Sequence, residues 1–197
     1  MLGIFLDTET NGLNAFKHKV IEIAFKIIDL ETSLLIDQYE SIVFQTQEEW
    51  KKSDPESLQI NGFQWEDVSS GKTKEIIAQE IQDCFTKNGI KRGSAVFICQ
   101  NPSFDRAFFS QFIDADLQEK KLWPYHWLDL ASMYWAASLL KKKETPSTEY
   151  PWKTGLSKDI IAKSYNLPPE KKPHKAMNGV DHLIVCYKTV IGFPLSS

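Results

Sequence analysis

Three apolar segments follow one another within the first 44 residues, and no other feature constrains the fold of this chain more. They are Leu2–Leu6, Val20–Leu30 and Leu34–Phe44, and residues 31–33 form a short turn between the last two. Segments rich in Ile, Val and Phe with short polar links are typical of neighbouring antiparallel strands. We therefore expect the chain to begin with an antiparallel meander whose first strand is buried.

Beyond this meander, strand-like and helix-like segments alternate. Ala95–Cys99 and Trp127–Leu130 are short apolar runs typical of buried strands. Helical spacing of apolar residues predicts helices at Thr73–Phe85, Ser103–Ile113, Leu156–Tyr165 and Val180–Val190, and another that continues from Leu130 through Leu140. Three strands followed by this alternation predict an α/β domain with a mixed central sheet.

The composition indicates one globular domain over residues 1–197. The chain is 42% apolar and holds twelve Phe, six Trp and six Tyr, which excludes a disordered protein. At this length folding buries about 70% of the surface of the unfolded chain, so the core needs neither a structural metal nor a disulfide. No apolar run approaches 18 residues, and we therefore expect no membrane span.

The cysteines and the net charge bear on the compartment and on the way the chain could bind nucleic acid. Cys84, Cys99 and Cys186 are scattered singly, which predicts buried reduced thiols and a cytoplasmic protein. The formal net charge of −3 excludes a broad basic clamp for nucleic acid. It leaves room for an enzyme that grips a few phosphates locally.

The segment Asp7-Thr8-Glu9-Thr10-Asn11-Gly12-Leu13 comes directly after the first predicted strand. Residues i and i+2 of a strand share one face, so Asp7 and Glu9 project together. Two neighbouring buried carboxylates repel each other unless a cation lies between them, and carboxylate oxygens are preferred ligands of Mg²⁺ and Mn²⁺. By itself the pair is also typical of a polar strand end that enters an Asn-Gly turn.

Two further polar motifs stand at the starts of helices. Gln100-Asn101-Pro102-Ser103-Phe104-Asp105 follows a predicted strand, and Ser103 is the expected N-cap of the helix after it. Asp105 then either compensates the helix dipole or belongs to a site. His174-Lys175-Ala176 precedes the last helix, which carries Asp181. A neutral imidazole beside a metal-bound water is a common general base, although a lone His among lysines is more often a surface residue.

Taken together and in this order, the motifs resemble those of the DEDDh branch of the DnaQ-like 3′–5′ exonucleases, which includes the proofreading epsilon subunit, RNase T and oligoribonuclease. Asp7 through Leu13 matches the family's first motif, Asp-x-Glu-Thr-x-Gly-Leu. Asn101 and Phe104-Asp105 match the Asn and Phe-Asp of the second motif. The resemblance extends from Gly3 to about Tyr187.

The resemblance implies an RNase H-like fold: a mixed five-stranded sheet, its first three strands antiparallel, with helices on both faces. It also implies hydrolysis of 3′-terminal phosphodiesters of single-stranded DNA or RNA, with release of nucleoside 5′-monophosphates. Two Mg²⁺ ions, for which Mn²⁺ substitutes, bracket the scissile phosphate in such enzymes. The implied partner is therefore the 3′ end of a single-stranded nucleic acid.

The resemblance also assigns roles to individual residues. Asp7 is expected to bridge both ions, Glu9 and Asp181 to hold one of them, and Asp105 to act on the other mainly through water. His174 is expected to deprotonate the attacking water. The side chains expected to contact the terminal nucleotide are those of Thr8, Thr10, Leu13, Asn101 and Phe104.

One spacing departs from the family pattern. The last metal-binding Asp stands five residues after the catalytic His in the family, whereas position 179 here is Gly and the next carboxylate is Asp181. On one continuous helix that shift rotates the side chain by about 200°. If Asn178 caps the helix, His174 lies in a loop and Asp181 faces the site from the first turn, which is the arrangement we expect. His182 is the rival general base.

Two questions stay open at the level of the sequence. If Asp181 is turned away, the chain is instead a catalytically impaired module that binds nucleic acid or protein. The sequence also does not tell DNA from RNA as substrate, and it does not tell whether the chain dimerises or accompanies a polymerase.

Overall fold

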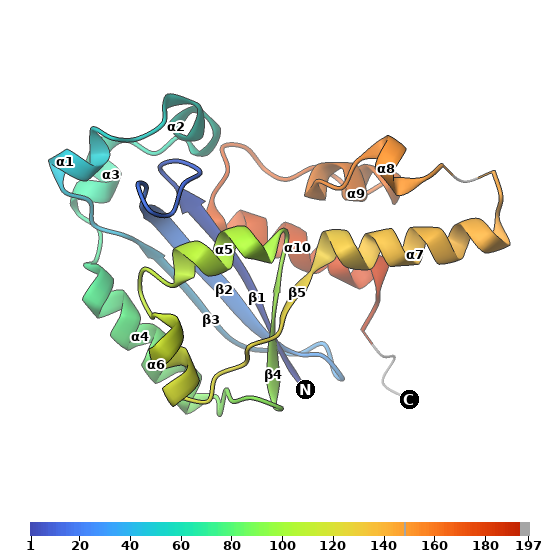
Figure 1. Cartoon of the computed structure of the whole chain (residues 1–197), viewed down its shortest axis with the longest axis horizontal. Helices are drawn as coiled ribbons and strands as arrows, with labels where there is room; N and C mark the ends of the chain where they lie inside the picture. Colours follow the sequence, from blue (N-terminus) through green and yellow to red (C-terminus); the bar gives the residue numbers. More distant parts are fainter. Residues whose placement is uncertain (148, 194–197) are drawn as a thin grey trace.

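The computed structural model describes residues 1–147 and 149–193, and its centre is a five-stranded sheet in the order β3-β2-β1-β4-β5 (Figure 1). The strands are β1 (Leu2–Thr10), β2 (Val20–Asp29), β3 (Leu35–Ile42), β4 (Ala95–Cys99) and β5 (Trp127–Asp129). The first three pair antiparallel, whereas β4 runs parallel to β1 and β5 parallel to β4. This topology confirms the expected mixed sheet and its initial meander.

Helices cover both faces of the sheet (Figure 1). One face packs against α4 (Lys74–Lys87), α5 (Pro102–Phe109) and α6 (Ala115–Lys120). The other face packs against α7 (Leu130–Glu144), α9 (Lys158–Ser164) and α10 (Ala176–Val190). Four shorter helices complete the described chain: α1 (Gln47–Trp50), α2 (Pro55–Asn61), α3 (Trp65–Ser69) and α8 (Pro151–Thr154).

Side chains along β1 point alternately to the two faces of the sheet. Ile4 and Leu6 are fully buried in the apolar layer under α4 and α5, and Phe5 is fully buried in the layer under α10. The same alternation continues to the end of the strand, so Asp7 and Glu9 lie on the face of Phe5. The sheet therefore delivers both carboxylates to the side that α10 covers.

Several elements differ from the sequence-based expectation. Helices α1, α2, α3, α6 and α8 were not predicted, since each spans seven residues or fewer and shows no complete period of apolar residues. The N-cap of α5 is Asn101 rather than Ser103, with Pro102 at the first helical position, where its missing N–H costs nothing.

The start of α10 is the correction that matters most. This helix begins at Ala176, two residues before the expected cap at Asn178. Its N-terminus is satisfied from another element: the Ala176 N–H donates a 2.6 Å hydrogen bond to Oε2 of Glu22 on β2. A carboxylate at this position also stabilises the positive end of the helix dipole. His174 lies in the loop before the helix, as expected.

No helix in the described ranges combines the length and the apolar character that a bilayer crossing requires.

Candidate active site

Asp7 and Glu9 form a crowded pair of carboxylates at the end of β1. The Asp7 side chain is 14% exposed, and Glu9 is buried. Burial raises the pKa of Asp7, and burial together with the charge of Asp7 raises the pKa of Glu9 to about 8. Carboxylates held in this way are unfavourable without a nearby positive charge.

A third carboxylate reaches this pair from α5. Asp105 is buried, and its Oδ1 accepts a 2.9 Å hydrogen bond from the Thr8 hydroxyl. Burial and the charge of Asp7 raise its pKa well above the usual range. The turn that presents it is fixed by Asn101, which adopts a left-handed conformation and donates its N–H to Oδ1 of Asp129 at 3.0 Å. Three predicted metal ligands are thus brought together.

Two buried charged residues that sequence reasoning missed complete the cluster. Nζ of Lys158, the first residue of α9, lies 3.1 Å from Oδ1 of Asp7 and 2.9 Å from Oε2 of Glu170. The Glu170 side chain is only 2% exposed, and despite that burial the neighbouring His182 and Lys158 lower its pKa to about 2. Asp7 and Glu170 likewise raise the pKa of Lys158 against the effect of burial. These shifts favour the charged forms of both Lys158 and Glu170.

His174 is the imidazole that faces the carboxylates. Its Nδ1 lies 3.5 Å from Oε1 of Glu170, and a ligand atom from each of His174, Glu170 and Glu9 falls within 4.8 Å of the other two. The backbone N–H of His174 donates to the Ile60 carbonyl of α2 at 3.2 Å, which holds its loop in place. The rival His182 is buried, with Nε2 3.1 Å from the Pro168 carbonyl oxygen.

Asp181 is not among the carboxylates that gather at Asp7, and this corrects our expectation for the fourth ligand. Its side chain is 54% exposed and forms an ion pair with Lys26 of β2. The residue of α10 that points at the cluster is Gly179, where a Cβ atom would fall on the Asp7 carboxylate. Because α10 begins before Asn178, no insertion in its first turn brings Asp181 round to the site.

The residues expected to contact substrate divide into two groups. The hydroxyls of Thr8 and Thr10 are used internally, donating to Asp105 and to the Gly12 carbonyl. Leu13, Asn101 and Phe104 instead line an open pocket of about 480 Å³ at the start of α5. The same pocket includes Phe16, whose ring is fully exposed and which sequence reasoning did not single out.

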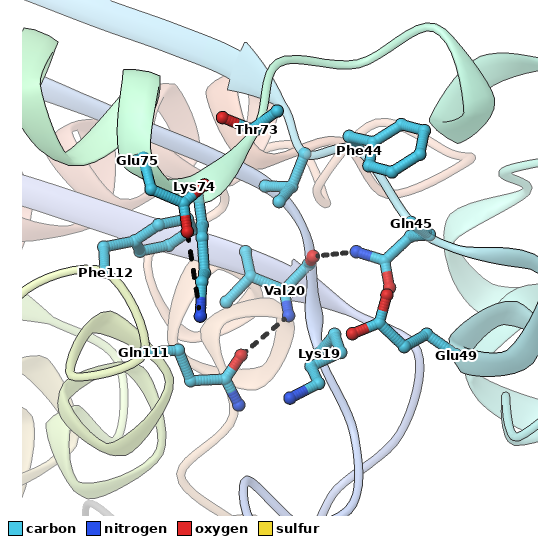
Figure 2. Close-up of a pocket in the computed structure, with 11 residues that line it drawn as sticks. Lys19, Val20, Phe44, Gln45, Glu49, Thr73, Lys74, Glu75, Gln111 and Phe112 are labelled. Atoms are coloured by element: carbon cyan, nitrogen blue, oxygen red, sulfur yellow. Dashed lines mark hydrogen bonds and ion pairs between the residues drawn. The ribbon is translucent and has the colours of Figure 1, made fainter.

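A separate cavity of about 300 Å³ lies at the start of β2 and holds none of these carboxylates (Figure 2). Gln45 and Gln111 flank Val20 there: Gln45 Nε2 donates to the Val20 carbonyl at 2.8 Å, and the Val20 N–H donates to Gln111 Oε1 at 3.4 Å. Its walls include two lysines and two glutamates, Lys19, Lys74, Glu49 and Glu75. The cavity has no link to the cluster around Asp7.

Comparisons with known proteins identify the family and support the fold. A family model described as an exonuclease, RNase_T, matches residues 4–181. Escherichia coli exonuclease I in complex with a dT13 oligonucleotide superposes with a TM-score of 0.71 at 17% identity over 98% of this chain and 41% of that chain. No curated protein sequence matches significantly.

Two other structures are similar. Cell-death related nuclease 4 matches with a TM-score of 0.70 at 13% identity, over 98% of this chain and 65% of that one. The nuclease domain of 3′hExo, a DEDDh family member bound to rAMP, matches with a TM-score of 0.67 at 13% identity, over 98% of this chain and 94% of that one. The chain spans less than half the length of exonuclease I, and at these identities the matches establish the fold.

The crowding of carboxylates predicts how Glu9→Gln affects stability. The pKa of Glu9 is about 8 in the folded chain against 4.5 ordinarily, so the folded state keeps a proton that the unfolded state releases between these values. Wild-type stability therefore falls as pH rises through this window. In EDTA, E9Q should melt at a higher temperature than wild type at pH 8 and at the same temperature at pH 4.

The matched control is Glu66→Gln, which changes an exposed carboxylate on α3. It should leave the melting temperature unchanged at both pH values. An E9Q protein that melts below wild type at pH 8 would show that Glu9 is stabilised in its ionised form, contrary to the geometry.

Proposed function

We propose a function from the premise that this chain belongs to the RNase_T family of exonucleases. The chain removes nucleotides from the 3′ ends of single-stranded DNA or RNA and releases nucleoside 5′-monophosphates. The observation that carries this proposal is the gathering of three carboxylates, Asp7, Glu9 and Asp105, where β1 ends and α5 begins, with the imidazole of His174 close to Glu9. A bound cation offsets the free-energy cost of burying three neighbouring carboxylates.

The donor set fits a hard divalent cation. All three carboxylates offer oxygen atoms, which Mg²⁺ and Mn²⁺ prefer, and burial first, then mutual repulsion, raises their pKa values. Asp7, Glu9 and Asp105 are the residues proposed to hold the ion. When bound, such an ion stabilises charge on a phosphate oxygen and acidifies a bound water.

His174 is proposed as the general base. Its ring is 29% exposed, so it reaches both solvent and the carboxylates. Oε1 of Glu170 lies 3.5 Å from Nδ1 of the ring, so Nε2 is the nitrogen proposed to take the proton of the attacking water. His182 lies behind Glu170 with its Nε2 at the Pro168 carbonyl, a position unsuited to that role.

The pocket lined by Leu13, Asn101, Phe104 and Phe16 is proposed to receive the 3′-terminal nucleotide. It adjoins Asp105 along α5, so a nucleotide seated there carries its phosphate toward the carboxylates. Two of the four side chains are aromatic, and aromatic rings bind bases of any sequence by stacking. Thr8 contributes indirectly, since its hydroxyl fixes the Asp105 carboxylate.

A second candidate function is a module that binds nucleic acid or protein without cleaving it. Two observations favour it: Asp181 is turned away from the cluster, and Lys158 already neutralises part of it. The two candidates separate in one assay, because a binding module retains labelled oligonucleotide intact whatever metal is supplied.

We expect degradation of 5′-labelled single-stranded DNA or RNA of equal sequence in Mg²⁺ or Mn²⁺, and none in EDTA. Asp7→Asn should lower the rate at least about tenfold, since losing a metal-positioning group removes more than about 1.4 kcal/mol of transition-state stabilisation. Asp181→Asn is the matched control and should keep the wild-type rate, because that carboxylate lies outside the cluster. An inactive wild type would favour the binding module.

His174→Ala should lower kcat by about 10²–10⁴, the usual contribution of a positioned general base, and leave Mn²⁺ affinity nearly unchanged. Single-turnover rates and Mn²⁺ titrations measure the two effects separately. The exposed His126 provides the control, and His126→Ala should be neutral. A loss of this size from His182→Ala, with H174A active, would reassign the base.

Phe16→Ala should raise KM about fivefold or more with little change in kcat, because stacking on one base contributes about 1–3 kcal/mol. Steady-state kinetics on a short oligonucleotide measures this. Phe44, a partly exposed ring that lines the separate cavity, is the control, and Phe44→Ala should not change KM. Equal KM values for F16A and wild type would remove Phe16 from the binding site.

A further inference from the structure

The place where α10 meets the end of β1 lacks a ligand that a second metal ion would need. A cation held jointly by these two elements requires an oxygen-bearing side chain on α10 opposite Asp7. The residue in that position is Gly179, whose missing Cβ is the reason that Asp7 and the helix approach so closely. Asp181 lies about 200° further round the helix and pairs with Lys26 instead.

The Lys158 ammonium fills this place. It lies 3.1 Å from Oδ1 of Asp7, 2.9 Å from Oε2 of Glu170 and 3.4 Å from the Gly179 carbonyl oxygen. An ammonium has three N–H donors, and these three oxygens take them all. A Cβ built on Gly179 would be 3.0 Å from Nζ, so the ammonium and a side chain at residue 179 would compete for one space.

The ammonium is also held firmly. The Lys158 side chain is only 13% exposed, and its helix begins at Lys158 with Ser157 as the N-cap. Glu170 is fixed from the backbone, where its N–H donates to Oδ1 of Asp159 at 2.9 Å. A divalent ion could enter this space only by expelling Lys158 from a buried position and leaving Glu170 unpaired, which is costly.

The other two carboxylates have no such direct partner in the part of the chain that the structure describes. Neither Glu9 nor Asp105 receives a hydrogen bond or ion pair from a lysine or arginine among the described residues. Thr8 is the side-chain donor to Asp105, and it carries no charge. Among the described residues, both carboxylates therefore keep oxygen atoms that no ammonium or guanidinium occupies and that can ligate a cation.

We infer that Lys158 replaces one of the two divalent ions of the expected mechanism, so that this chain binds a single divalent ion at Asp7, Glu9 and Asp105 and supplies the second positive charge itself. The inference rests on the proposed function for its meaning in catalysis, but the number of ions bound is a property of the folded chain alone. Lys158 acts as a positioning residue for Asp7.

Titration with Mn²⁺, followed by calorimetry and by the electron paramagnetic resonance signal of the ion, measures the stoichiometry directly. Wild type should bind one Mn²⁺ per chain and show no signal from a coupled pair of ions. The variant Lys158→Met removes the ammonium and adds no side chain at residue 179, where a Cβ would overlap the Asp7 carboxylate. It should bind two Mn²⁺ per chain, a doubling, with the spectrum of a coupled pair.

Lys163→Met is the matched control, since Lys163 is an exposed lysine one turn further along α9. It should bind one Mn²⁺. Two ions on wild type, or none, overturns the inference, and this result needs no variant to fold. If Lys158→Met fails to fold by circular dichroism, Lys158→Gln replaces it, and a second, weaker Mn²⁺ site at Asp7 and Glu170 is then expected.

The same samples separate this inference from the proposed function. A wild type that binds one Mn²⁺ but leaves oligonucleotides intact contradicts the exonuclease proposal and supports the role of Lys158. A wild type that degrades oligonucleotides with two Mn²⁺ bound supports the exonuclease and overturns the role of Lys158.

Discussion

Electrostatic repulsion among carboxylates buried between β1 and α10 is the constraint on which the rest of this site depends. Asp7, Glu9 and Asp105 are delivered by one strand and one helix start, and no lysine or arginine of those two elements forms an ion pair with them. The compensation comes from the C-terminal third of the chain, where Lys158 reaches Asp7. The helix that carries Lys158 packs on α10 through buried apolar residues, Ile161 and Ala162 against Leu183, and this packing holds the lysine within reach of the end of β1.

The register of α10 follows from the same constraint. Glu22 caps its first N–H, Gly179 admits the Asp7 carboxylate, and Asp181 pairs with Lys26, so three contacts with β1 and β2 define a single rotation of the helix. Turning the helix to bring Asp181 toward Asp7 would break the cap and drive another side chain into the carboxylates. Asp181 is thus a residue that fixes the helix on the sheet, and its distance from the cluster follows from that.

Local patterns in the sequence predicted most of the fold and most of the cluster, but not Lys158 or Glu170. Period-two alternation placed Asp7 and Glu9 on one face, and the strand-to-helix junction brought Asp105 to the same edge. Lys158 and Glu170 gave no such signal, because Lys158 opens a short helix and Glu170 precedes two further lysines, patterns typical of solvated surface. Asp7, which pairs with Lys158, lies 151 residues away, beyond any local pattern. The one available hint was the glycine five residues after His174.

That glycine and Lys158 explain each other. Because residue 179 on α10 is a glycine, there is space beside the Asp7 carboxylate. The Lys158 side chain from α9 is long enough to place its ammonium in that space, and without it Asp7 would have no positive partner there. An aspartate in place of the glycine would crowd Asp7 and pair with the ammonium, while a shorter residue in place of the lysine would leave Asp7 and Glu170 unpaired. A tethered ammonium is also present without recruitment from solution, whereas an ion must be bound. It carries one charge instead of two, however, so it stabilises a pentavalent phosphate less. With Lys158 in this position, the chain stabilises the transition state less than a second divalent ion would. In return, part of the site's positive charge is in place before any metal ion binds.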